Sequence, residues 1–371
     1  MSEKLQTVYL NDFYNLKGAK LAPFSGYSMP INFLQGIIKE HFHTRSAVGI
    51  FDVSHMGMML IYCNENNINK LELIIPQNLR KLKTFNSVYT FILNIEGGIV
   101  DDLIISKIKI DNSEYFFLVY NAARKKIDQE IIFNLIKDVN IILDNSILAV
   151  QGPLSANIIN NLFPETENMK FMQIKTINYK NENILISRGG YTGEDGFEIF
   201  IPNTVITEFV EKVLSYEQTL LCGLGSRDSL RLEAGLCLYG NELNENISPI
   251  QANLGWAIPK SRIQEGGFNG HQRILNEINN GVNKKRVGIK SKSKSILRSH
   301  MTLHDKNEFK IGEITSGGFS PSLKTSIAMA YIDTNIISDS LVINCLIRNK
   351  MEEVIITKLP FIQHKYKRGQ R

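Results

Sequence analysis

Several patterns that mark common protein classes are missing from this chain of 371 residues. Its four cysteines, Cys63, Cys222, Cys237 and Cys345, lie far apart and form no CxxC pair. Their spacing argues for a reducing compartment and against a structural zinc site. The seven histidines form no HExxH motif, and we expect no bound metal. No apolar run approaches the roughly twenty residues that cross a bilayer, so we expect no membrane partner.

The start of the chain also lacks targeting signals. Residues 1–10 contain neither an apolar signal core nor an arginine-rich transit pattern. We therefore expect a soluble intracellular protein, in the cytoplasm of a bacterium or, if the source is eukaryotic, in the mitochondrial matrix after removal of a leader. The net charge of +5 is spread over scattered lysines. Such a charge favours an anionic ligand or an acidic partner over nucleic acid.

What is present is an ordinary globular composition, with 43% hydrophobic and 21% charged residues. The length predicts two or three packed units. Apolar periodicity predicts a helix over 33–47, and an irregular segment rich in proline, glycine and aromatics over 21–30. Short strands separated by turn residues, which are typical of an antiparallel barrel or sandwich, are predicted at 287–289, 311–315, 327–331, 341–347 and 354–359. The basic tail after Phe361 is expected to be frayed.

The most chemically suggestive stretch is GGIVDDLI, residues 97–104. Its glycines permit a tight turn, and the apolar residues on either side of the acids predict a buried strand. Neighbouring side chains of a strand point to opposite faces, so Asp101 and Asp102 cannot share one role. A carboxyl group held against apolar walls is a candidate acid, base or charge stabiliser. The alternative is a hairpin with turn-capping aspartates.

A second motif, RGGYTGEDGFEI, covers residues 188–199. No lysine follows its glycines and the next segment is a strand, so the motif resembles neither a P-loop nor a dinucleotide fingerprint. The glycines let the backbone approach a flat ligand. Glu198, on the strand that follows, could accept two parallel hydrogen bonds from an N–C–N edge such as a pterin presents. A surface hairpin with solvated acids is the equal alternative.

A third motif runs from Gly223 to Gly240 and is helical in its first half. Arg227, at the start of this helix, is well placed to bind a carboxylate with its two-pronged guanidinium. Arg231 and Glu233 could instead form an ion-pair network. Elsewhere, His55 follows a predicted strand, where a general base or a backbone hydrogen-bond partner is expected.

Six motifs in this order resemble the aminomethyltransferase, or T-protein, family of the glycine cleavage system. They are FDVSHM (51–56), GGIVDDL (97–103), QGP (151–153), GYTGEDGFE (190–198), RDSLRLEAGLCLY (227–239) and GEITSGGFSP (312–321). The resemblance spans nearly the whole chain. One departure is Tyr27, where many members of the family have tryptophan.

The resemblance implies an α+β fold, a cloverleaf of three subdomains around a central folate channel, with a C-terminal antiparallel β-barrel. We expect a folate-binding domain over 1–280, in which residues 58–140 form an inserted subdomain, and the barrel over 281–371. The implied reaction moves a one-carbon unit from the aminomethyl-dihydrolipoyl arm of H-protein to tetrahydrofolate. The products are 5,10-methylenetetrahydrofolate and ammonia.

By motif position, the resemblance implies that Asp102 is the catalytic residue. It would hydrogen-bond folate nitrogens, aid their deprotonation and stabilise the cationic carbon as ammonia departs. Tetrahydrofolate is the expected co-substrate and H-protein the expected partner. The folate-binding residues expected from the family are Met56, Tyr89, Asn121, Tyr191, Glu198, Arg227, Arg286 and Tyr366.

Two other functions fit the same scaffold less well. Related enzymes demethylate small methylated compounds, but they often carry a fused flavin domain for which this chain has no room. A folate-binding maintenance protein for iron–sulfur assembly would have a KGCYxGQE-like segment with a reactive cysteine. This chain has GYTGEDGFE there, without a cysteine.

Overall fold

One six-stranded sheet has its central strands buried on both faces. In the computed structural model, which describes residues 4–339 and 341–369, the strand order is β11-β12-β13-β10-β4-β14. The strands are β4 (Val48–Asp52), β10 (Asn145–Gln151), β11 (Gln173–Tyr179), β12 (Glu182–Arg188), β13 (Gly196–Pro202) and β14 (Thr219–Leu221). Leu148 and Ala149 are neighbours on β10 yet pack in different apolar clusters. This is the alternation that a sheet covered on both faces requires.

Helices cover one face of this sheet. Side chains of α5 (Ser155–Leu162) and α6 (Asn203–Leu214) pack with Leu148 and Ile199 in one buried cluster. Tyr14 of α1 (Asn11–Leu16) joins the same cluster and donates a hydrogen bond from its hydroxyl to Asp52 Oδ2 at 2.8 Å.

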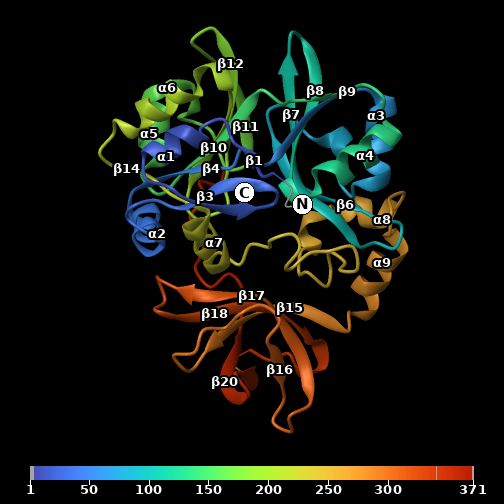
Figure 1. Cartoon of the computed structure of the whole chain (residues 1–371). Helices are drawn as coiled ribbons and strands as arrows, with labels where there is room; N and C mark the ends of the chain where they lie inside the picture. Colours follow the sequence, from blue (N-terminus) through green and yellow to red (C-terminus); the bar gives the residue numbers. More distant parts are fainter. Residues whose placement is uncertain (1–3, 340, 370–371) are drawn as a thin grey trace.

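The second sheet has five strands in the order β6-β7-β8-β5-β9. They are β5 (Gly57–Tyr62), β6 (Ser87–Leu93), β7 (Ile99–Ile110), β8 (Ser113–Tyr120) and β9 (Val139–Ile141). One face packs against α3 (Glu65–Ile74) and α4 (Lys125–Leu135). The other face contacts the six-stranded sheet, where the ring centroids of Phe117 and Phe200 lie 4.9 Å apart. The two sheets stand next to each other in Figure 1.

The predicted C-terminal barrel is confirmed. Six antiparallel strands close in the order β15-β18-β17-β16-β19-β20 and form the lower part of Figure 1. They are β15 (Lys284–Ser291), β16 (Thr302–His304), β17 (Lys310–Ser320), β18 (Thr325–Asp333), β19 (Val342–Ile347) and β20 (Lys350–Thr357). The five predicted strands correspond to five of these. The three-residue β16 is too short for its alternation to be recognised in the sequence.

The irregular segment predicted over 21–30 is wrong. Strands β2 (Lys20–Phe24) and β3 (Tyr27–Asn32) form a hairpin, and β1 (Gln6–Thr7) pairs with β3. The turn uses Ser25 and Gly26, both at positive φ. Proline is compatible here because Pro23 lies on the edge strand β2, and Pro30 lies beyond the two residues that β1 pairs with. The helix predicted next is α2 (Ile37–Ser46).

A long connection joins the six-stranded sheet to the barrel. It contains α7 (Leu224–Glu233), α8 (Lys260–Glu265), α9 (His271–Asn280) and the short helix η4 (Gly255–Ala257). Side chains of this connection pack with Phe91, Leu93 and Ile99 of the five-stranded sheet. The remaining short helices are η1 (Leu79–Lys81), η2 (Ala122–Arg124), η3 (Pro164–Thr166) and η5 (Thr334–Ile336). The boundary at residue 280 and the inserted subdomain over 58–140 stay predictions.

The frayed tail predicted after Phe361 is wrong for residues 361–369. Tyr366 stacks on Phe171 with ring centroids 4.2 Å apart. The backbone N–H of Lys365 donates to Gly193 O at 2.8 Å, and that of Phe171 donates to Lys367 O at 2.8 Å. The tail thus returns from the barrel to the six-stranded sheet. The end of the predicted tail, residues 370–371, lies outside the described residues.

Candidate active site

Two glycines shape the turn that leads into β7. Gly97 has φ of 78°, a conformation that favours glycine. A Cβ atom on Gly98 would lie 1.7 Å from the backbone oxygen of Glu245. The side chain of Asn94 closes the turn, since its Oδ1 accepts from the N–H of Gly98 at 2.8 Å. Both glycines are therefore required by the backbone and by the segment packed against it.

A β-bulge then sets the direction of the two acids. Ile92 pairs with Asp101, whereas Leu93 pairs with Ile99, so Val100 is an extra residue on β7. Asp101 is fully buried, while Asp102 keeps part of its surface accessible to solvent. The two neighbouring acids therefore have different surroundings.

Asn121, which follows β8, links both acids. Its Nδ2 donates to Asp101 Oδ1 and to Asp102 Oδ1, each at 2.9 Å, and its backbone N–H donates to Asp101 Oδ2 at 3.0 Å. The same Nδ2 lies 3.0 Å from the backbone oxygen of Asp102. One amide thus fixes the position of one carboxyl relative to the other.

Tyr89 of β6 provides the second hydrogen bond to Asp102. Its hydroxyl donates to Asp102 Oδ2 at 2.9 Å. The Tyr89 ring stacks on Trp256, with centroids 5.9 Å apart and planes inclined by 22°. Trp256 is 73% exposed, although tryptophan normally buries most of its ring. An exposed aromatic surface therefore begins one residue away from the Asp102 carboxyl.

The surroundings of Asp102 raise the pKa of its carboxyl group toward neutral pH. Burial, and then the negative charge of Asp101, raise the pKa of Asp102 to about 7, although the hydrogen bonds from Tyr89 and Asn121 lower it. The group is surrounded by protein on most sides and still has an accessible face. A carboxyl group with such a pKa can both accept and donate a proton at physiological pH.

A third acid belongs to this group. Asp128 lies in the first turn of α4 and is 1% exposed, and neither of its carboxyl oxygens has a hydrogen-bond donor among the described residues. Burial and the charge of Asp101 raise the pKa of Asp128 to about 10. Burial also raises the pKa of Asp101. Sequence analysis missed Asp128. The available signal was its spacing of four and eight residues from Ile132 and Ile136, which places an acid on the buried stripe of the helix.

Arg227, Tyr191 and Glu198 form the second part of the site. The Arg227 guanidinium lies 4.9 Å from the Tyr191 ring centroid, and its Nη1 is buried without a hydrogen-bond partner among the described residues. Burial raises the pKa of Glu198, and the charge of Arg227 lowers it. No described residue hydrogen-bonds the Glu198 carboxyl group. Both residues are partly accessible to solvent, and each has polar atoms without a hydrogen-bond partner among the described residues.

Tyr191 joins the two parts. Its hydroxyl donates to the backbone oxygen of Cys237. Cys237 packs in the same apolar cluster as Tyr89, which donates to Asp102. Burial raises the pKa of Tyr191, the charge of Arg231 lowers it, and the charge of Asp102 raises it. Asp102, Tyr89, Asn121, Tyr191, Glu198 and Arg227 thus form one connected group, contributed by both sheets and by α7.

His55 and Met56 lie in the turn between β4 and β5. The His55 ring is buried, and its Nδ1 has no hydrogen-bond partner among the described residues. Burial, and then the charges of Arg227 and Lys125, lower the pKa of His55 to about 3. The ring is therefore neutral at physiological pH. Met56 is partly buried in the apolar cluster between the two sheets.

Two predicted ligand residues make no hydrogen bond to the connected group among the described residues. Arg286 of β15 is 5% exposed and donates from Nε to Ala252 O at 2.8 Å and from Nη1 to Gly235 O at 2.9 Å. Tyr366 lies in the tail, with one ring face covered by Phe171. No hydrogen bond joins either residue to Asp102 in the part of the chain that the structure describes.

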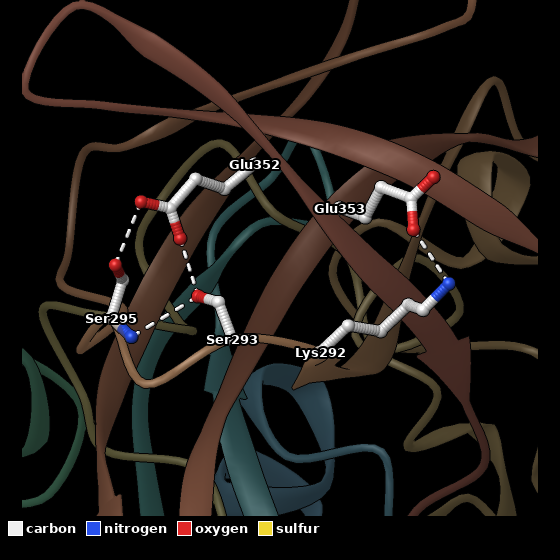
Figure 2. Close-up of a pocket in the computed structure, with 5 residues that line it drawn as sticks. All are labelled: Lys292, Ser293, Ser295, Glu352 and Glu353. Atoms are coloured by element: carbon white, nitrogen blue, oxygen red, sulfur yellow. Dashed lines mark hydrogen bonds and ion pairs between the residues drawn. The ribbon is translucent and has the colours of Figure 1, made fainter.

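A hollow on the barrel wall offers no comparable chemistry. Figure 2 shows Glu352 accepting hydrogen bonds from Ser293 and Ser295, and Lys292 paired with Glu353. These polar groups bind one another. Within residues 4–339 and 341–369, no three His, Cys, Asp or Glu side chains converge in a way that could hold a metal ion. Over the same residues, no helix combines the length and apolar character needed to span a bilayer.

The fold and the site together define a class of enzyme. Two packed sheets covered by helices carry a mostly enclosed carboxyl group, Asp102, and a closed barrel completes the fold. The family model described as the GCVT N-terminal domain matches residues 10–262, and that of the glycine cleavage T-protein C-terminal barrel domain matches residues 284–363. The chain belongs to this family, the aminomethyltransferases or T-proteins of the glycine cleavage system.

Individual relatives agree over nearly the full length. The probable mitochondrial aminomethyltransferase of Schizosaccharomyces pombe is 36% identical over 375 residues, covering 99% of this chain and 95% of that protein. The mitochondrial aminomethyltransferase of Pisum sativum is 38% identical over 376 residues, covering 98% and 91%. The crystal structure of glycine cleavage system aminomethyltransferase T from Bartonella henselae superposes with a TM-score of 0.92 at 33% identity, covering 98% and 100%. The predicted family, fold class and type of enzyme are confirmed.

Proposed function

We propose that this chain transfers the one-carbon unit of an aminomethyl group from the dihydrolipoyl arm of H-protein to tetrahydrofolate. The products are 5,10-methylenetetrahydrofolate, the free dihydrolipoyl arm and ammonia. Family membership supports the reaction type. The observation that carries the proposal for this chain is the setting of Asp102, a mostly enclosed but partly accessible residue whose carboxyl group accepts hydrogen bonds from Tyr89 and Asn121.

The reaction needs a group that handles protons. The C–S bond and the C–NH2 bond of the aminomethyl sulfide break, and two C–N bonds form to N5 and N10 of tetrahydrofolate. The two protons that leave N5 and N10 end on the sulfur and on ammonia, so no oxidant or reductant is required. Asp102 is suited to accept a proton from a folate nitrogen and to return it to a leaving group.

The charge of Asp102 has a second use. While ammonia departs, positive charge develops on the transferred carbon, and an ionised carboxylate nearby stabilises it. Tyr89 and Asn121 hold both Asp102 oxygens in place before substrate arrives. This preorganisation leaves little rearrangement for the reaction step itself.

Glu198 and Arg227 are proposed to orient the folate. The Glu198 carboxyl group receives no hydrogen bond from the described residues, so it is available to a pterin edge that donates two. Arg227 has a free Nη1 and can bind a polar ligand atom or the folate carboxylates. Tyr191, which lies under the Arg227 guanidinium, would form part of the pocket wall.

The other predicted ligand residues are proposed in narrower roles. Asn121 already uses its amide nitrogen for the two acids, which leaves Oδ1 to face folate. Arg286 uses Nε and Nη1 for backbone oxygens, so only Nη2 is left for the glutamyl tail. Tyr366 can offer its exposed portion near that tail. Met56 would supply an adaptable apolar wall.

The delivery route is also a proposal. H-protein would bring its arm to the accessible side of Asp102, near the exposed Trp256. The net charge of +5 suits an acidic partner. The curated relatives named above are mitochondrial proteins by name, and we propose either the mitochondrial matrix or a bacterial cytoplasm for this chain.

The test measures methylenetetrahydrofolate and ammonia formed from aminomethylated H-protein by the wild type and by Asp102→Asn. We expect the wild type to form both products, and the variant to bind tetrahydrofolate but lose most turnover. Asp111→Asn is the matched control, because Asp111 is exposed in the turn at the far end of the same β7–β8 hairpin.

Two results would contradict the proposal. If the wild type binds tetrahydrofolate and releases no ammonia from this donor, the substrate is wrong and small methylated compounds should be tried next. If Asp102→Asn is as active as Asp111→Asn, the reaction stands but Asp102 does not carry it.

A further inference from the structure

Three carboxyl groups share one buried region beside the proposed reaction centre. Asp101 and Asp102 lie on β7, and Asp128 faces them from α4. Asp101 and Asp128 are 0% and 1% exposed. Three neighbouring ionised carboxylates in such a place would repel one another strongly, so at least one proton must be shared among them.

The hydrogen-bond donors show which acid holds that proton. Asp101 accepts two hydrogen bonds from Asn121, and Asp102 accepts one from Asn121 and one from Tyr89. Both oxygens of Asp128 lack a donor among the described residues. A buried carboxylate without donors is the costliest state of the three, whereas a neutral carboxylic acid can act as a donor itself.

We propose that Asp128 is a neutral carboxylic acid which donates its proton to Asp101, keeps Asp101 ionised, and thereby sets the charge that acts on Asp102. Asp128 is thus a positioning residue, because it acts on Asp102 through Asp101 and Asn121 and is not placed against substrate. The inference deepens the proposed function and rests on it for the role of Asp102.

The other charged and titratable groups around Asp128 agree with this assignment. Arg124 is the cation that faces Asp128. Its Nη2 is engaged by Glu245, and its Nε is buried without a hydrogen-bond partner among the described residues, so no hydrogen bond joins Arg124 to Asp128. Burial raises the pKa values of Tyr120 and Tyr239, and the charge of Asp128 raises both further. Both hydroxyl groups therefore stay neutral. The raised pKa of Asp128 itself has burial and Asp101 as its main causes.

The arrangement has a chemical consequence. With the proton fixed on Asp128, Asp101 remains a carboxylate whose nearby charge opposes ionisation of Asp102. Proton exchange around neutral pH then occurs at Asp102, which keeps part of its surface accessible to solvent, and not at the buried Asp101. Without the donor at 128, Asp101 would take up the proton and its charge would no longer act on Asp102.

The first experiment looks for the proton without substrates. Infrared difference spectra at about pH 8.5 should show the carbonyl stretching band of a protonated carboxylic acid that is lost in Asp128→Asn. The band should remain in Asp138→Asn, the same change at an exposed acid shortly after α4. If no band is lost in Asp128→Asn, the proton is not on Asp128 and the proposal is overturned.

The second experiment measures the pH dependence of kcat/KM for aminomethyl transfer. Asparagine keeps a donor toward Asp101 and is neutral, so Asp128→Asn should leave the acid-limb midpoint within roughly half a pH unit of wild type. Asp128→Leu has no donor, and its midpoint should fall by about one unit or more. A merely structural role for Asp128 would change the rate or the melting temperature without this difference between the two variants.

The remaining outcomes of the pH experiment also decide whether Asp128 holds the proton. Equal downward shifts in both variants would show that wild-type Asp128 is ionised, and equal midpoints in all three proteins would show that it does not act on Asp102. Either outcome overturns the proposal. If Asp128→Leu does not fold, the infrared comparison still decides. If the wild type forms no product, the proposed function fails, while the infrared band still tests the proton on Asp128.

Discussion

Two buried clusters of acids in this molecule are neutralised in opposite ways. In the site cluster, Asp101, Asp102 and Asp128 have raised pKa values, and burial is the first cause for each. The junction cluster is centred on Glu233 of α7, where α2 and the barrel meet. Glu233 is also fully buried, yet hydrogen bonds and charges from its neighbours overcome the effect of burial and lower its pKa to about 2.

The neighbours of Glu233 explain the contrast. Arg45 Nη2 donates at 2.8 Å, His41 Nε2 lies 3.2 Å away, and Ser322 donates from both its N–H and its hydroxyl. Glu194 nearby accepts from Arg45. Cations and donors therefore hold the junction cluster in one charge state. In the site cluster, bound protons reduce the negative charge of the acids instead. Unlike a fixed cation, a proton can be exchanged during a reaction.

The largest expected effect is a loss of catalytic activity when an acid of the site cluster is replaced. Asp102→Asn should lower kcat by about 10²- to 10⁴-fold, because it removes the group proposed to transfer protons. It should not lower the melting temperature, since it removes a carboxyl group whose ionised form is repelled by the charge of Asp101. Ammonia release and thermal unfolding, measured on the same preparation, check both parts. A large loss of stability would show that the Asp102 carboxyl is structural, as Glu233 is.

The next effect is on stability at the junction cluster. Glu233→Ala should lower the free energy of unfolding by about 3–5 kcal/mol, because it removes the buried acceptor shared by Arg45 Nη2, Ser320 and Ser322. Denaturant unfolding measures it. Glu211→Ala, at an exposed position of α6, is the control and should change stability by less than about 0.5 kcal/mol. Similar losses in both variants would mean that the Glu233 network contributes little.

The two clusters should also respond to pH with opposite sign. The folded pKa of Glu233 is below its ordinary value, so its stabilisation is present above about pH 4.5 and is lost as the pH falls toward about 2. The folded pKa of Asp128 is above its ordinary value of 3.8, so its stabilisation is full below that pH and is lost as the pH rises through about 10.

The alkaline part of this prediction can be isolated. Between about pH 5 and pH 9, wild type should lose on the order of 5 kcal/mol more stability than Asp128→Asn, at about 1.4 kcal/mol per pH unit. The variant has no proton to lose at this position. Urea unfolding across the range measures the two slopes. Parallel slopes would indicate that residue 128 does not change its protonation on unfolding.

The smallest expected effect concerns one hydrogen bond. Tyr89→Phe removes a donor that lowers the pKa of Asp102, so the acid limb of kcat/KM should move up by about one pH unit. Activity should then fall about tenfold at pH 6 and little at pH 8.5. Tyr62→Phe, at an exposed position of β5, is the control. A pH-independent loss would mean that Tyr89 acts only through substrate binding.

The sequence was most informative where one periodicity or one motif decided the outcome. Alternating apolar residues predicted five of the six barrel strands, and the GGIVDDLI motif directed attention to Asp102. It was misleading at β2 and β3, because proline and glycine were taken as signs of irregular structure although Pro23 lies on an edge strand. The role assigned to each site residue is still a proposal.

Contacts across long sequence distances could not be derived from the sequence. Asp128 is an ordinary charged residue of a helix until the fold places α4 against β7. The same holds for the junction cluster, where Arg45 meets Glu233 across 188 residues. Trp256, the one tryptophan of the chain, gave no sign that its ring would stack on Tyr89 and remain exposed.

The returning tail couples the opening of two regions that are far apart in the sequence. The N–H of Lys365 binds Gly193 in the loop that carries Tyr191, and the N–H of Ile362 binds the backbone oxygen of Glu233. Because one short segment is bound to both regions, its detachment would release the loop and the end of α7 together. We therefore expect the backbone amide hydrogens of Ile362 and Lys365 to exchange with solvent at similar rates, as one cooperative unit.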